Sequence, residues 1–560
     1  MCGIYGRIRE RGAHEHRLRP EAAAQERVRA QRAIEALRHR GPEDSGVWQR
    51  GGVTLAHARL KIIDLSERAG QPMENEDGAV VAVFNGEIYN FKDLRVELQS
   101  AGHQFRSDSD TEVLVHGYEQ WGGGLLERLQ GMFAFGIWDG HRRRLLLARD
   151  RAGQKPLFYA VTPGDTLTFA SEIKGLLAAG VERTPRARSV VDYFTYGYVP
   201  PPHTFYENIY ELPPAHFLWV RPGDLPQREA LHSAESGEVV TAFSPAARPQ
   251  RYWRVSFGER NVSGRRPSFR EAASRVRAHL EEAVEDRLLA DVPLGAFLSG
   301  GLDSTVVVGI AAKKLTRELK TFSIGFSSDP RYDETRYARM AAEAFGVQHT
   351  EFEVTPQEMT LVEDLVWAHD GPFADSSAIP TTLLSRLTRE HVTVALTGDG
   401  GDEVFAGYDR FRAGVLSEKL PAFLREELTR RVVPWLPNAD ERTFWGRVRR
   451  FFSGLSAPLP ERMLRWQPGF AAQVPEIFRQ EVLEKALGHG FTRSGGVSQM
   501  PPALLGYAEE VFAHTEGKSP LARLLDHNFN TYLPQDLQVK MDRCTMAHAL
   551  EARRDRKSVV

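Results

Sequence analysis

Short apolar runs separated by turn-forming residues fill the first third of the chain. Gly, Pro, Asn and Asp punctuate these runs, which is typical of turns between strands. Closely spaced aliphatic and aromatic runs of this kind predict an antiparallel sheet. The predicted strands are 53–57, 79–84, 133–138, 145–149 and 157–160, and a helix at 20–37 precedes them.

In the second half of the chain, short apolar runs alternate with predicted helices. Apolar runs at 294–298, 321–326 and 392–397 are separated by segments with helical spacing, such as 271–289. This alternation predicts a parallel sheet with right-handed crossovers. Because ligands of such sheets bind at the carboxyl ends of the strands, we expect a site in the loops that follow the three runs.

A polar stretch rich in Pro, Ala, Ser and Glu separates the two patterns. It predicts a linker at 216–268 with an exposed loop at 231–250, after which Tyr252 and Trp253 return the chain to ordered structure.

Composition narrows the possible functions. With 560 residues, the chain is long enough for two or more domains. Its 72 basic and 74 acidic residues nearly balance, so neither nucleic acid nor a membrane surface is an expected partner. Two cysteines, Cys2 and Cys544, exclude a disulfide framework and favour a reducing compartment. Without a spanning apolar run or a secretory signal pattern, we expect a cytoplasmic protein.

The turn Ser299-Gly300-Gly301-Leu302-Asp303-Ser304 lies between a predicted strand and a predicted helix. Its two glycines allow close approach of a ligand to the backbone, and N–H groups at a helix N-terminus bind phosphate. We place the helix N-cap near Ser304 and Thr305. A carboxylate, Asp303, among phosphate donors implies a Mg²⁺ ion beside it. The alternative is an ordinary glycine turn.

A second glycine-rich turn, Gly398 to Glu403, follows another predicted strand. It carries Asp399, Asp402 and Glu403, without the spacing of a calcium-binding EF-hand loop. The alternative is a solvated acidic loop. Because this turn and the Asp303 turn lie at the same sheet edge, we predict Asp303 and Asp402 as the metal ligands.

Near the start of the chain, Cys2 follows Met1 directly. Removal of Met1 would leave the thiol beside an α-amine of pKa about 8, which can act as its base. The alternative is a cysteine buried in a first strand. Three polar clusters carry groups that could bind a ligand: Arg59 for a carboxylate, Asn85 with the Gly86 N–H for an oxyanion, and Asp110 for an ammonium group. Asn-Gly can equally be a hairpin turn, and Asp-Ser-Asp a helix cap.

The N-terminal motifs together resemble those of class II glutamine amidotransferases. They include M-C-G-I, R-H-R-G-P-E, F-N-G-E-I-Y-N, S-D-S-D-T-E and L-L-A-R-D-R-x-G-x-K-P-L-F-Y. The resemblance implies that Cys2 is the nucleophile and its amine the base. The glutamine-binding residues that it implies are Arg59, Leu60, Ile62, Ile63, Asn85, Gly86, Glu87 and Asp110, of which Asn85 and Gly86 stabilise the oxyanion.

The second half resembles asparagine synthetases, through S-G-G-x-D-S, D-G-P-F-A-D-S-S-A-I-P, T-G-D-G-G-D-E-V-F-A-G-Y and L-P-x-D-L-x-x-K-x-D-R. S-G-G-x-D-S is similar to the pyrophosphate loop of ATP pyrophosphatases. Lys540 is then expected to stabilise charge during acyl transfer, the alternative being a helix-surface charge. Asp399 is expected to be catalytic, although well-studied members have glutamate there. The implied ATP-binding residues are Leu298, Ser299, Gly300, Gly301, Asp303, Ser304, Ile324, Thr397 and Gly398.

Both resemblances imply an α+β half followed by an α/β half. The first is an N-terminal-nucleophile αββα glutaminase sandwich at 1–215, and the second is a parallel-sheet ATP-pyrophosphatase domain at 269–554, similar to adenine nucleotide alpha hydrolases. Ammonia from glutamine would travel through an internal tunnel to a β-aspartyl-AMP intermediate, giving asparagine, glutamate, AMP and pyrophosphate. The alternatives are another carboxylate acceptor, on a cell-envelope sugar or a peptide, and an inactive ATP- or glutamine-binding protein. Family members are often homodimers, so a homodimer is possible.

The last residues, 555–560, depart from the family pattern, in which V-P-F-L-D would be expected. They resemble one reading frame of a sequencing adapter, and we expect a non-native tail on an incomplete second domain. A native polar C-terminus is the alternative. We expect the tail to follow directly on a helix.

Overall fold

The computed structural model of this protein describes residues 2–9, 19–162, 166–224, 248–258, 267–325, 333–354, 361–437, 443–467, 469–471, 473–487 and 500–554. The predicted loop at 231–250 lies almost entirely outside these residues, as does the predicted tail at 555–560. Within the described residues, no helix combines the length and the apolar character needed to cross a membrane.

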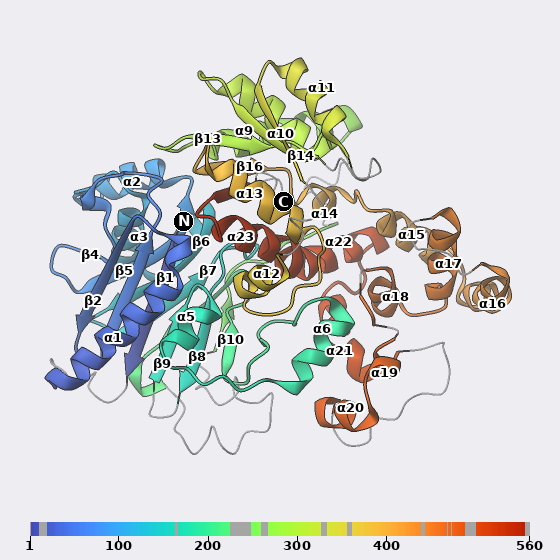
Figure 1. The fold of residues 1–560 in the computed structure, drawn as a ribbon, viewed down its shortest axis with the longest axis horizontal. Coiled ribbons are helices and arrows are strands. Elements are labelled where there is room, and N and C mark those ends of the chain that lie inside the picture. Colours follow the sequence, from blue (N-terminus) through green and yellow to red (C-terminus); the bar gives the residue numbers. More distant parts are fainter. Residues whose placement is uncertain are drawn as a thin grey trace.

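Two six-stranded antiparallel sheets form the first half of the molecule, seen in blue to green in Figure 1. In spatial order, the first sheet contains β10 (Ile209–Glu211), β8 (Phe158–Thr162), β9 (Thr166–Ala170), β1 (Gly3–Arg9), β3 (Val53–Arg59) and β2 (Asp44–Arg50). The second contains β12 (Gln250–Arg251), β11 (His216–Val220), β7 (Arg144–Arg149), β6 (Gly131–Asp139), β5 (Val80–Ile88) and β4 (Met73–Glu74).

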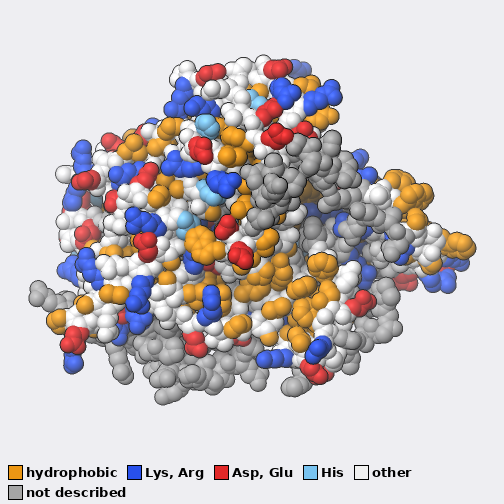
Figure 2. All heavy atoms as spheres, in the orientation of Figure 1, with side chains coloured by type: hydrophobic (Ala, Val, Ile, Leu, Met, Phe, Trp, Pro, Cys, Tyr) orange, Lys and Arg blue, Asp and Glu red, His pale blue; other side chains and the backbone are white. Residues whose placement is uncertain are grey.

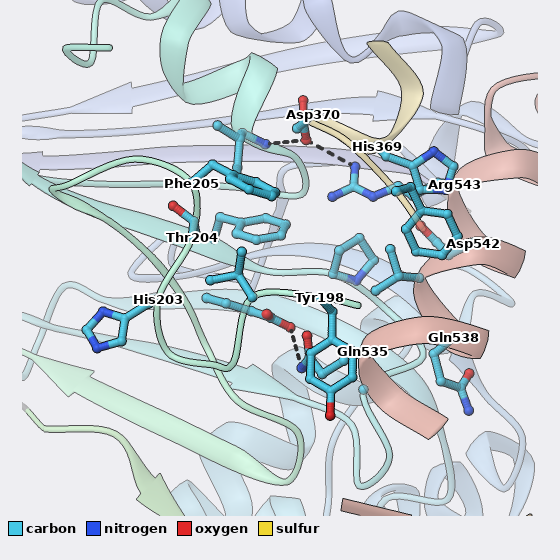
Figure 3. A pocket seen from close by; sticks show the side chains of 18 of the residues that line it. Tyr198, His203, Thr204, Phe205, His369, Asp370, Gln535, Gln538, Asp542 and Arg543 are labelled. Atoms are coloured by element: carbon cyan, nitrogen blue, oxygen red, sulfur yellow. Dashed lines mark hydrogen bonds and ion pairs between the residues drawn. The ribbon is translucent and has the colours of Figure 1, made fainter. Parts of the chain in front are cut away.

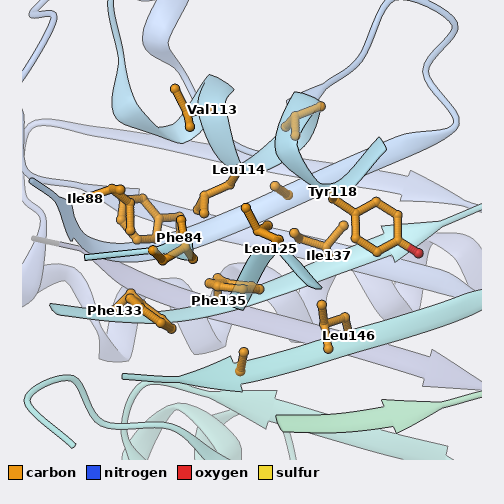
Figure 4. Packing of buried hydrophobic residues seen from close by; sticks show 14 of the residues in the cluster. Phe84, Ile88, Val113, Leu114, Tyr118, Leu125, Phe133, Phe135, Ile137 and Leu146 are labelled. Carbon is orange, nitrogen blue, oxygen red and sulfur yellow. The ribbon is translucent and has the colours of Figure 1, made fainter. Parts of the chain in front are cut away.

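The sheets pack face to face because side chains alternate along each strand. In β1, Ile4 and Ile8 face the second sheet, while Tyr5 packs on the other side with residues of α1 (Pro20–Ala36) and α5 (Ile173–Ala178). Outward residues of the second sheet pack against α2 (Phe91–Ser100), α3 (Asp110–Trp121) and α4 (Leu125–Arg128); Figure 4 shows the contact of Phe84 and Phe135 with Leu114. The result is the four-layer αββα sandwich that the motifs imply.

A five-stranded parallel sheet forms the second half, in the order β15 (Gln348–Glu353), β14 (Lys320–Gly325), β13 (Leu294–Phe297), β16 (Val394–Thr397) and β17 (Glu551–Arg554). Apolar residues of α9 (Phe269–Asp286), α10 (Leu302–Lys314) and α11 (Thr335–Phe345) cover one face. Those of α13 (Ala378–Arg389) and α23 (Gln538–Met546) cover the other. Both faces are therefore buried, as parallel sheets require.

Further helices extend from these two halves. One of them, α6 (Ala187–Tyr196), lies between α5 and β10 in the chain, and α12 (Val362–His369) and α14 (Gly401–Phe405) lie near the parallel sheet. The peripheral helices, drawn in orange to red in Figure 1, are α15 (Asp409–Glu418), α16 (Ala422–Val432), α17 (Phe444–Gly454), α18 (Leu459–Trp466), α19 (Val474–Ile477), α20 (Gln480–Leu487), α21 (Pro502–Ala513), α22 (Pro520–Asn530) and the π-helix η8 (Leu533–Leu537).

Basic and acidic side chains are intermixed on the surface. Basic and acidic side chains alternate over the face shown in Figure 2, in keeping with the small net charge. Exposed aromatic residues occur on α16 and on the short 3-10 helix that follows it (Val433–Trp435), where Phe423 is 73% and Trp435 89% exposed.

The structure corrects three sequence-based predictions. The strand predicted at 79–84 continues to Ile88, so Asn85 and Gly86 lie within β5 rather than in a hairpin turn. Helix α10 begins at Leu302 with Gly301 as its N-cap, earlier than the predicted cap at Ser304 and Thr305. The segment before the expected tail is the strand β17, not a helix. The domain boundaries 1–215, 216–268 and 269–554 stay predictions.

Candidate active sites

Cys2 lies immediately before β1 and is buried. Its backbone N–H donates to Asn85 Oδ1 at 3.0 Å, and its thiol lies 3.9 Å from the Leu60 carbonyl oxygen. Burial raises the pKa of the thiol, an effect that the chain N-terminus, a hydrogen bond with the Leu60 backbone and Arg59 partly offset. Because the thiolate is the reactive form, such a thiol needs a neighbouring base to act as a nucleophile.

Asn85 is placed beside the cysteine by its position in the buried strand β5. Its Oδ1 is occupied by the Cys2 N–H, whereas its Nδ2 is buried and has no hydrogen-bond partner among the described residues. A buried donor left unpaired is costly unless a ligand satisfies it. A side chain at Gly86 would place its Cβ 2.1 Å from the Met132 carbonyl oxygen, so the strand pairing requires glycine there.

The other predicted glutamine ligands surround the same place. Arg59 is buried at the end of β3 and donates to the carbonyl oxygens of Asp64 and Ser66 at 2.5 and 2.9 Å. Asp110 is the first residue of α3, and its Oδ2 accepts the Ile88 N–H at 2.9 Å. Burial raises the pKa of Asp110 to about 6, which a bound ammonium group would oppose. Ser109 caps the helix, so the cap interpretation of this motif also holds.

Leu60 and Ile62 join the first half to the second. Both are buried in an apolar cluster with residues of β13, α10 and α11, and Ile63 packs at its edge. The Asp291 N–H donates to the Ile62 carbonyl oxygen at 3.0 Å.

Glu87, also in β5, is held by the second half of the molecule. Arg553 of β17 donates to Glu87 Oε2 at 3.0 Å and to Glu551 Oε1 at 2.6 Å, and all three side chains are buried. Glu87 Oε1 is buried and has no hydrogen-bond partner within the described part of the chain. Burial raises the pKa of Glu87, Asp110 and Glu551 add to the rise, and Arg553 opposes it.

A second ion pair crosses between the halves at Arg40, a residue that the sequence-based site prediction missed. Arg40 Nε donates to the Cys2 carbonyl oxygen at 3.2 Å, and its other nitrogens donate to Asp542 of α23 at 2.8 and 3.1 Å. Glu172 accepts from Arg40 at 2.6 Å and pairs with Arg543 of α23 at 2.7 Å. The cysteine is thus tied to the helix that carries Lys540.

The second site is a cavity at the carboxyl ends of β13 and β16. It is lined by residues of both predicted loops: Ser299, Gly301, Asp303, Ser304, Thr397, Gly398, Asp399, Asp402 and Glu403, with Phe297, Tyr408, Leu537 and Met541. Gly300 adopts a φ of +80°, and a Cβ there would lie 2.5 Å from Tyr337 and Ala338. A Cβ at Gly398 would lie 2.6 Å from the Ser304 nitrogen, so the two loops touch only because this residue is glycine.

The acidic side chains of this cavity suit a hard cation. Asp303 is in the first turn of α10, and Asp402 is in the first turn of α14. The Asp402 carboxylate packs against Gly407, where any Cβ would lie 1.8 Å from its Oδ1. Carboxylates that share one cavity with serine hydroxyls form the donor set that Mg²⁺ prefers. Asp399 accepts a hydrogen bond from the Thr397 hydroxyl at 2.8 Å.

Lys540 is buried, which contradicts its interpretation as a helix-surface charge. Its Nζ donates to Asp375 Oδ2 at 2.7 Å and to the Ser377 hydroxyl at 2.8 Å. Burial acts to lower the pKa of Lys540, but Asp375 and Asp399 outweigh it and raise the pKa. The lysine stays charged beside the acidic loop without lining the cavity.

Some predicted residues lie apart from the cavity lining. Leu298 is buried in the apolar core, Ile324 lies in β14, and Gly300 forms the turn without lining the cavity. Tyr408 and Glu403, which share a hydrogen bond, line the cavity but were not among the predicted ATP-binding residues. Only their membership of the motif G-D-E-V-F-A-G-Y could have indicated these two residues from the sequence.

A further cavity lies between the two halves, and Figure 3 shows its lining. Tyr198 and Phe205 come from the first half, and His369, Asp370 and Arg543 come from the second, with Asp370 and Arg543 paired at 3.4 Å. No predicted glutamine or ATP ligand lines it.

Comparison with known proteins identifies one family in each half of the chain. The glutamine amidotransferase domain family matches residues 1–229, and the asparagine synthase family matches residues 275–555.

Three relatives illustrate the range of similar proteins. A Mycobacterium tuberculosis protein named among the glutamine-hydrolysing asparagine synthetases is 33% identical over 93% of this chain and 75% of its own length. Asparagine synthetase [glutamine-hydrolyzing] 1 of Bacillus subtilis is 31% identical over 99% of this chain and 79% of its own length. Amidase chry2 of Gibberella zeae is 33% identical over 75% of this chain and 61% of its own length.

Proposed function

The chain belongs to the asparagine synthase family and is a glutamine-dependent ligase, and we propose that it converts aspartate, glutamine and ATP to asparagine, glutamate, AMP and pyrophosphate. The observation that carries this proposal is that one chain holds both a Cys2–Asn85 pair and a cavity formed by the loops 299–304 and 398–403.

Glutamine hydrolysis belongs to the first site. After removal of Met1, the α-amine takes the proton of the Cys2 thiol, and the sulfur attacks the glutamine carboxamide. The C–N bond then breaks, the amine returns the proton to the departing ammonia, and water hydrolyses the thioester to glutamate. The unpaired Asn85 Nδ2 donates to the oxyanion of the tetrahedral intermediate, together with the Gly86 N–H. Arg59 binds the α-carboxylate of glutamine, and Asp110 and the free Glu87 Oε1 bind its α-ammonium group, while Leu60, Ile62 and Ile63 enclose the substrate.

Acceptor activation belongs to the second site. The loop 299–304 and the N-terminus of α10 bind the phosphates of ATP, and Leu298, Ile324 and Gly398 border its adenosine. Asp303 and Asp402 would hold Mg²⁺, which would supply charge neutralisation on the phosphates when bound. Attack of the β-carboxylate of aspartate on the α-phosphorus gives β-aspartyl-AMP and releases pyrophosphate. Asp399 and the charged Lys540 position and stabilise the reacting groups.

Amide formation completes the reaction. Ammonia from the first site travels inside the protein and attacks the acyl-adenylate, which releases AMP. The ion pairs Arg40–Asp542 and Glu87–Arg553 hold the two sites in one arrangement while this transfer takes place.

A screen of carboxylate acceptors tests the proposed function. Purified protein is incubated with ATP, Mg²⁺, glutamine and one acceptor at a time, and AMP and pyrophosphate are measured. Aspartate should give the highest rate, with one asparagine for each AMP. Pyrophosphate release with another acceptor but not with aspartate would contradict the aspartate assignment, and ATP binding without turnover would contradict the synthetase assignment.

A second candidate keeps the chemistry but changes the acceptor. Asp399 stands where well-studied synthetases carry glutamate, and some relatives are named amidases. A shorter carboxylate leaves more room beside the Thr397 hydroxyl, so a larger carboxylate, on a cell-envelope sugar or a peptide, is the alternative that the same screen would detect.

A further inference from the structure

Two histidines and a glutamate meet on the outer side of the first half, away from both proposed sites. His116 and Glu119 belong to α3, and His103 lies in the loop between α2 and α3. One nitrogen or oxygen atom from each lies within 4.8 Å of the others. His116 is buried, and His103 and Glu119 are partly exposed, so an ion can enter from solvent.

The distances suit a small divalent ion. His116 Nδ1 lies 3.0 Å and His103 Nδ1 3.8 Å from Glu119 Oε2. Ligands at bond lengths of about 2.0–2.2 Å around a tetrahedral ion lie about 3.3 Å apart, so small side-chain rotations would bring the three atoms onto one ion.

The outer atoms of His103 and Glu119 are hydrogen-bonded, and the outer nitrogen of His116 faces two carboxylates. His116 Nε2 lies 3.7 Å from Glu112 and 3.9 Å from Glu76. His103 Nε2 contacts Gln120 Oε1 at 3.2 Å, and Glu119 Oε1 accepts from Asn75 Nδ2 at 2.7 Å. Such partners on the far side of each ligand orient it and fix the histidine tautomer, as they do in established metal sites.

We propose that His103, His116 and Glu119 form a binding site for a borderline divalent metal ion of the Zn²⁺, Co²⁺ or Ni²⁺ class. Two imidazoles and one carboxylate match the preferences of these ions and not those of Mg²⁺, which favours oxygen ligands. One or two coordination positions remain for water.

The site connects to the segment that precedes Asp110. Glu112, which faces His116, accepts the N–H groups of Arg106 and Ser107, each at 2.8 Å, and the Ser107 hydroxyl at 2.6 Å. An ion at His103 and His116 therefore fixes the start of the 103–109 segment directly and lies beside the glutamate that holds Arg106 and Ser107. Bound metal stabilises the loop that leads into the helix carrying Asp110.

Metal binding to tag-free full-length protein tests this assignment. The Cys2→Ala background removes a competing thiolate, and Co²⁺ alone is the probe, followed by absorption and calorimetry. One equivalent should bind, raise Tm with concentration, and slow hydrogen exchange at the amides of Arg106 and Ser107.

Matched variants identify the ligands. His103→Ala and Glu119→Gln replace partly exposed side chains and should each weaken Co²⁺ binding about 100-fold, while Glu112→Gln should weaken it about 10-fold. His141→Ala is the control, since His141 is exposed and pairs only with Asp77 among the described residues; it should bind like the parent. Equal Co²⁺ affinity in His103→Ala, Glu119→Gln and His141→Ala, or no binding by the parent, would overturn the site and leave an ion-paired histidine cluster only.

Discussion

At the scale of single residues, the Asn85 side chain both fixes the position of Cys2 and leaves a donor for a ligand. One atom of its amide holds the backbone of Cys2, and the other is left buried and unpaired. An unpaired buried donor costs the free protein about 1–3 kcal/mol. In the proposed mechanism this cost is recovered when Nδ2 donates to the oxyanion.

The Cys2→Ala variant should lose glutamine-dependent amide synthesis and keep ammonia-dependent synthesis, because the thiol reacts only with glutamine. Glutamate release and AMP formation, each measured with glutamine or with ammonium chloride, separate the two activities. Residual glutamate release by the variant at the parent rate would disprove the nucleophile assignment.

Asp303→Asn and Asp402→Asn should each lower ATP–pyrophosphate exchange by about 100-fold or more, since each removes a carboxylate from the proposed Mg²⁺ site. Glutaminase activity should stay near the parent value because Cys2 lies in the other half of the molecule. Asp409→Asn, a change at an exposed carboxylate on α15, serves as the control. Exchange at the parent rate in either cavity variant would refute the metal pairing.

The sequence predicted a site residue where that residue belongs to a recognisable motif. The Ser299–Ser304 turn and the 398–403 turn come together in one cavity, as the strand pattern required. Arg40 and Arg553 were not assigned, because their partners Asp542 and Glu87 are hundreds of positions away. No local pattern records such a contact.

At the scale of elements, β17 is one of the strands that the sequence pattern did not indicate. Its four residues, Glu551 to Arg554, are buried although three of them are charged. A strand prediction depends on apolar side chains, and here ion pairs and carbonyl groups replace them: Arg553 donates to the carbonyl oxygens of Arg287 and Leu289 and pairs with Glu87. The end of β5 was missed for the same reason, because polar residues stand there in place of apolar ones.

Arg553→Lys should weaken glutamine use although Arg553 belongs to the second half. Lysine keeps the charge but cannot reach Glu87, Glu551 and two carbonyl groups at once. We expect KM for glutamine to rise about 10-fold, with ammonia-dependent AMP formation changed about twofold or less. Glu87→Gln should have a similar effect, and the double variant should be no worse than either single one.

Arg554→Lys is the matched control for this prediction. Arg554 is the next residue of β17, and it donates to the carbonyl oxygens of Leu537 and Gln538 rather than to Glu87. If both arginine variants changed KM for glutamine equally, a general effect on the strand would explain the result and the specific link to Glu87 would be refuted.

At the scale of the whole molecule, buried ion pairs join the two halves. Asp542 accepts from Arg40 and lies 3.5 Å from Lys155, all within the interface. Burial acts to raise the pKa of Asp542, but Arg40 and Lys155 outweigh it and lower the pKa to about 2 from its ordinary 3.8. The layers of each half were predicted from the sequence. The interface was not, because it depends on charged residues whose partners lie in distant motifs.

The interface should therefore loosen in acid. A carboxyl group whose pKa is lower in the folded protein adds stability above its unfolded pKa, here about 2 kcal/mol. This contribution should disappear as the pH falls from about 4 to 2. Urea unfolding at pH 7, 5 and 3 measures it through the difference between parent and Asp542→Asn.

At pH 7 the Asp542→Asn variant should be less stable by about 3–5 kcal/mol, since it leaves Arg40 and Lys155 with one negative partner fewer. The difference should shrink towards pH 3. A difference that is independent of pH would show that Asp542 acts through packing and not through its charge.

The contact between β17 and Glu87 can form only late in the synthesis of the chain. Cys2 leaves the ribosome first, whereas Arg553 is made near the other end of the chain, on the order of a minute later at ordinary rates of translation. Until then the growing chain carries the nucleophile beside a glutamate that lacks its cationic partner. We therefore expect glutamine to bind more weakly to the half-made protein than to the chain that contains Arg553, so that less ammonia is released before the second half is made.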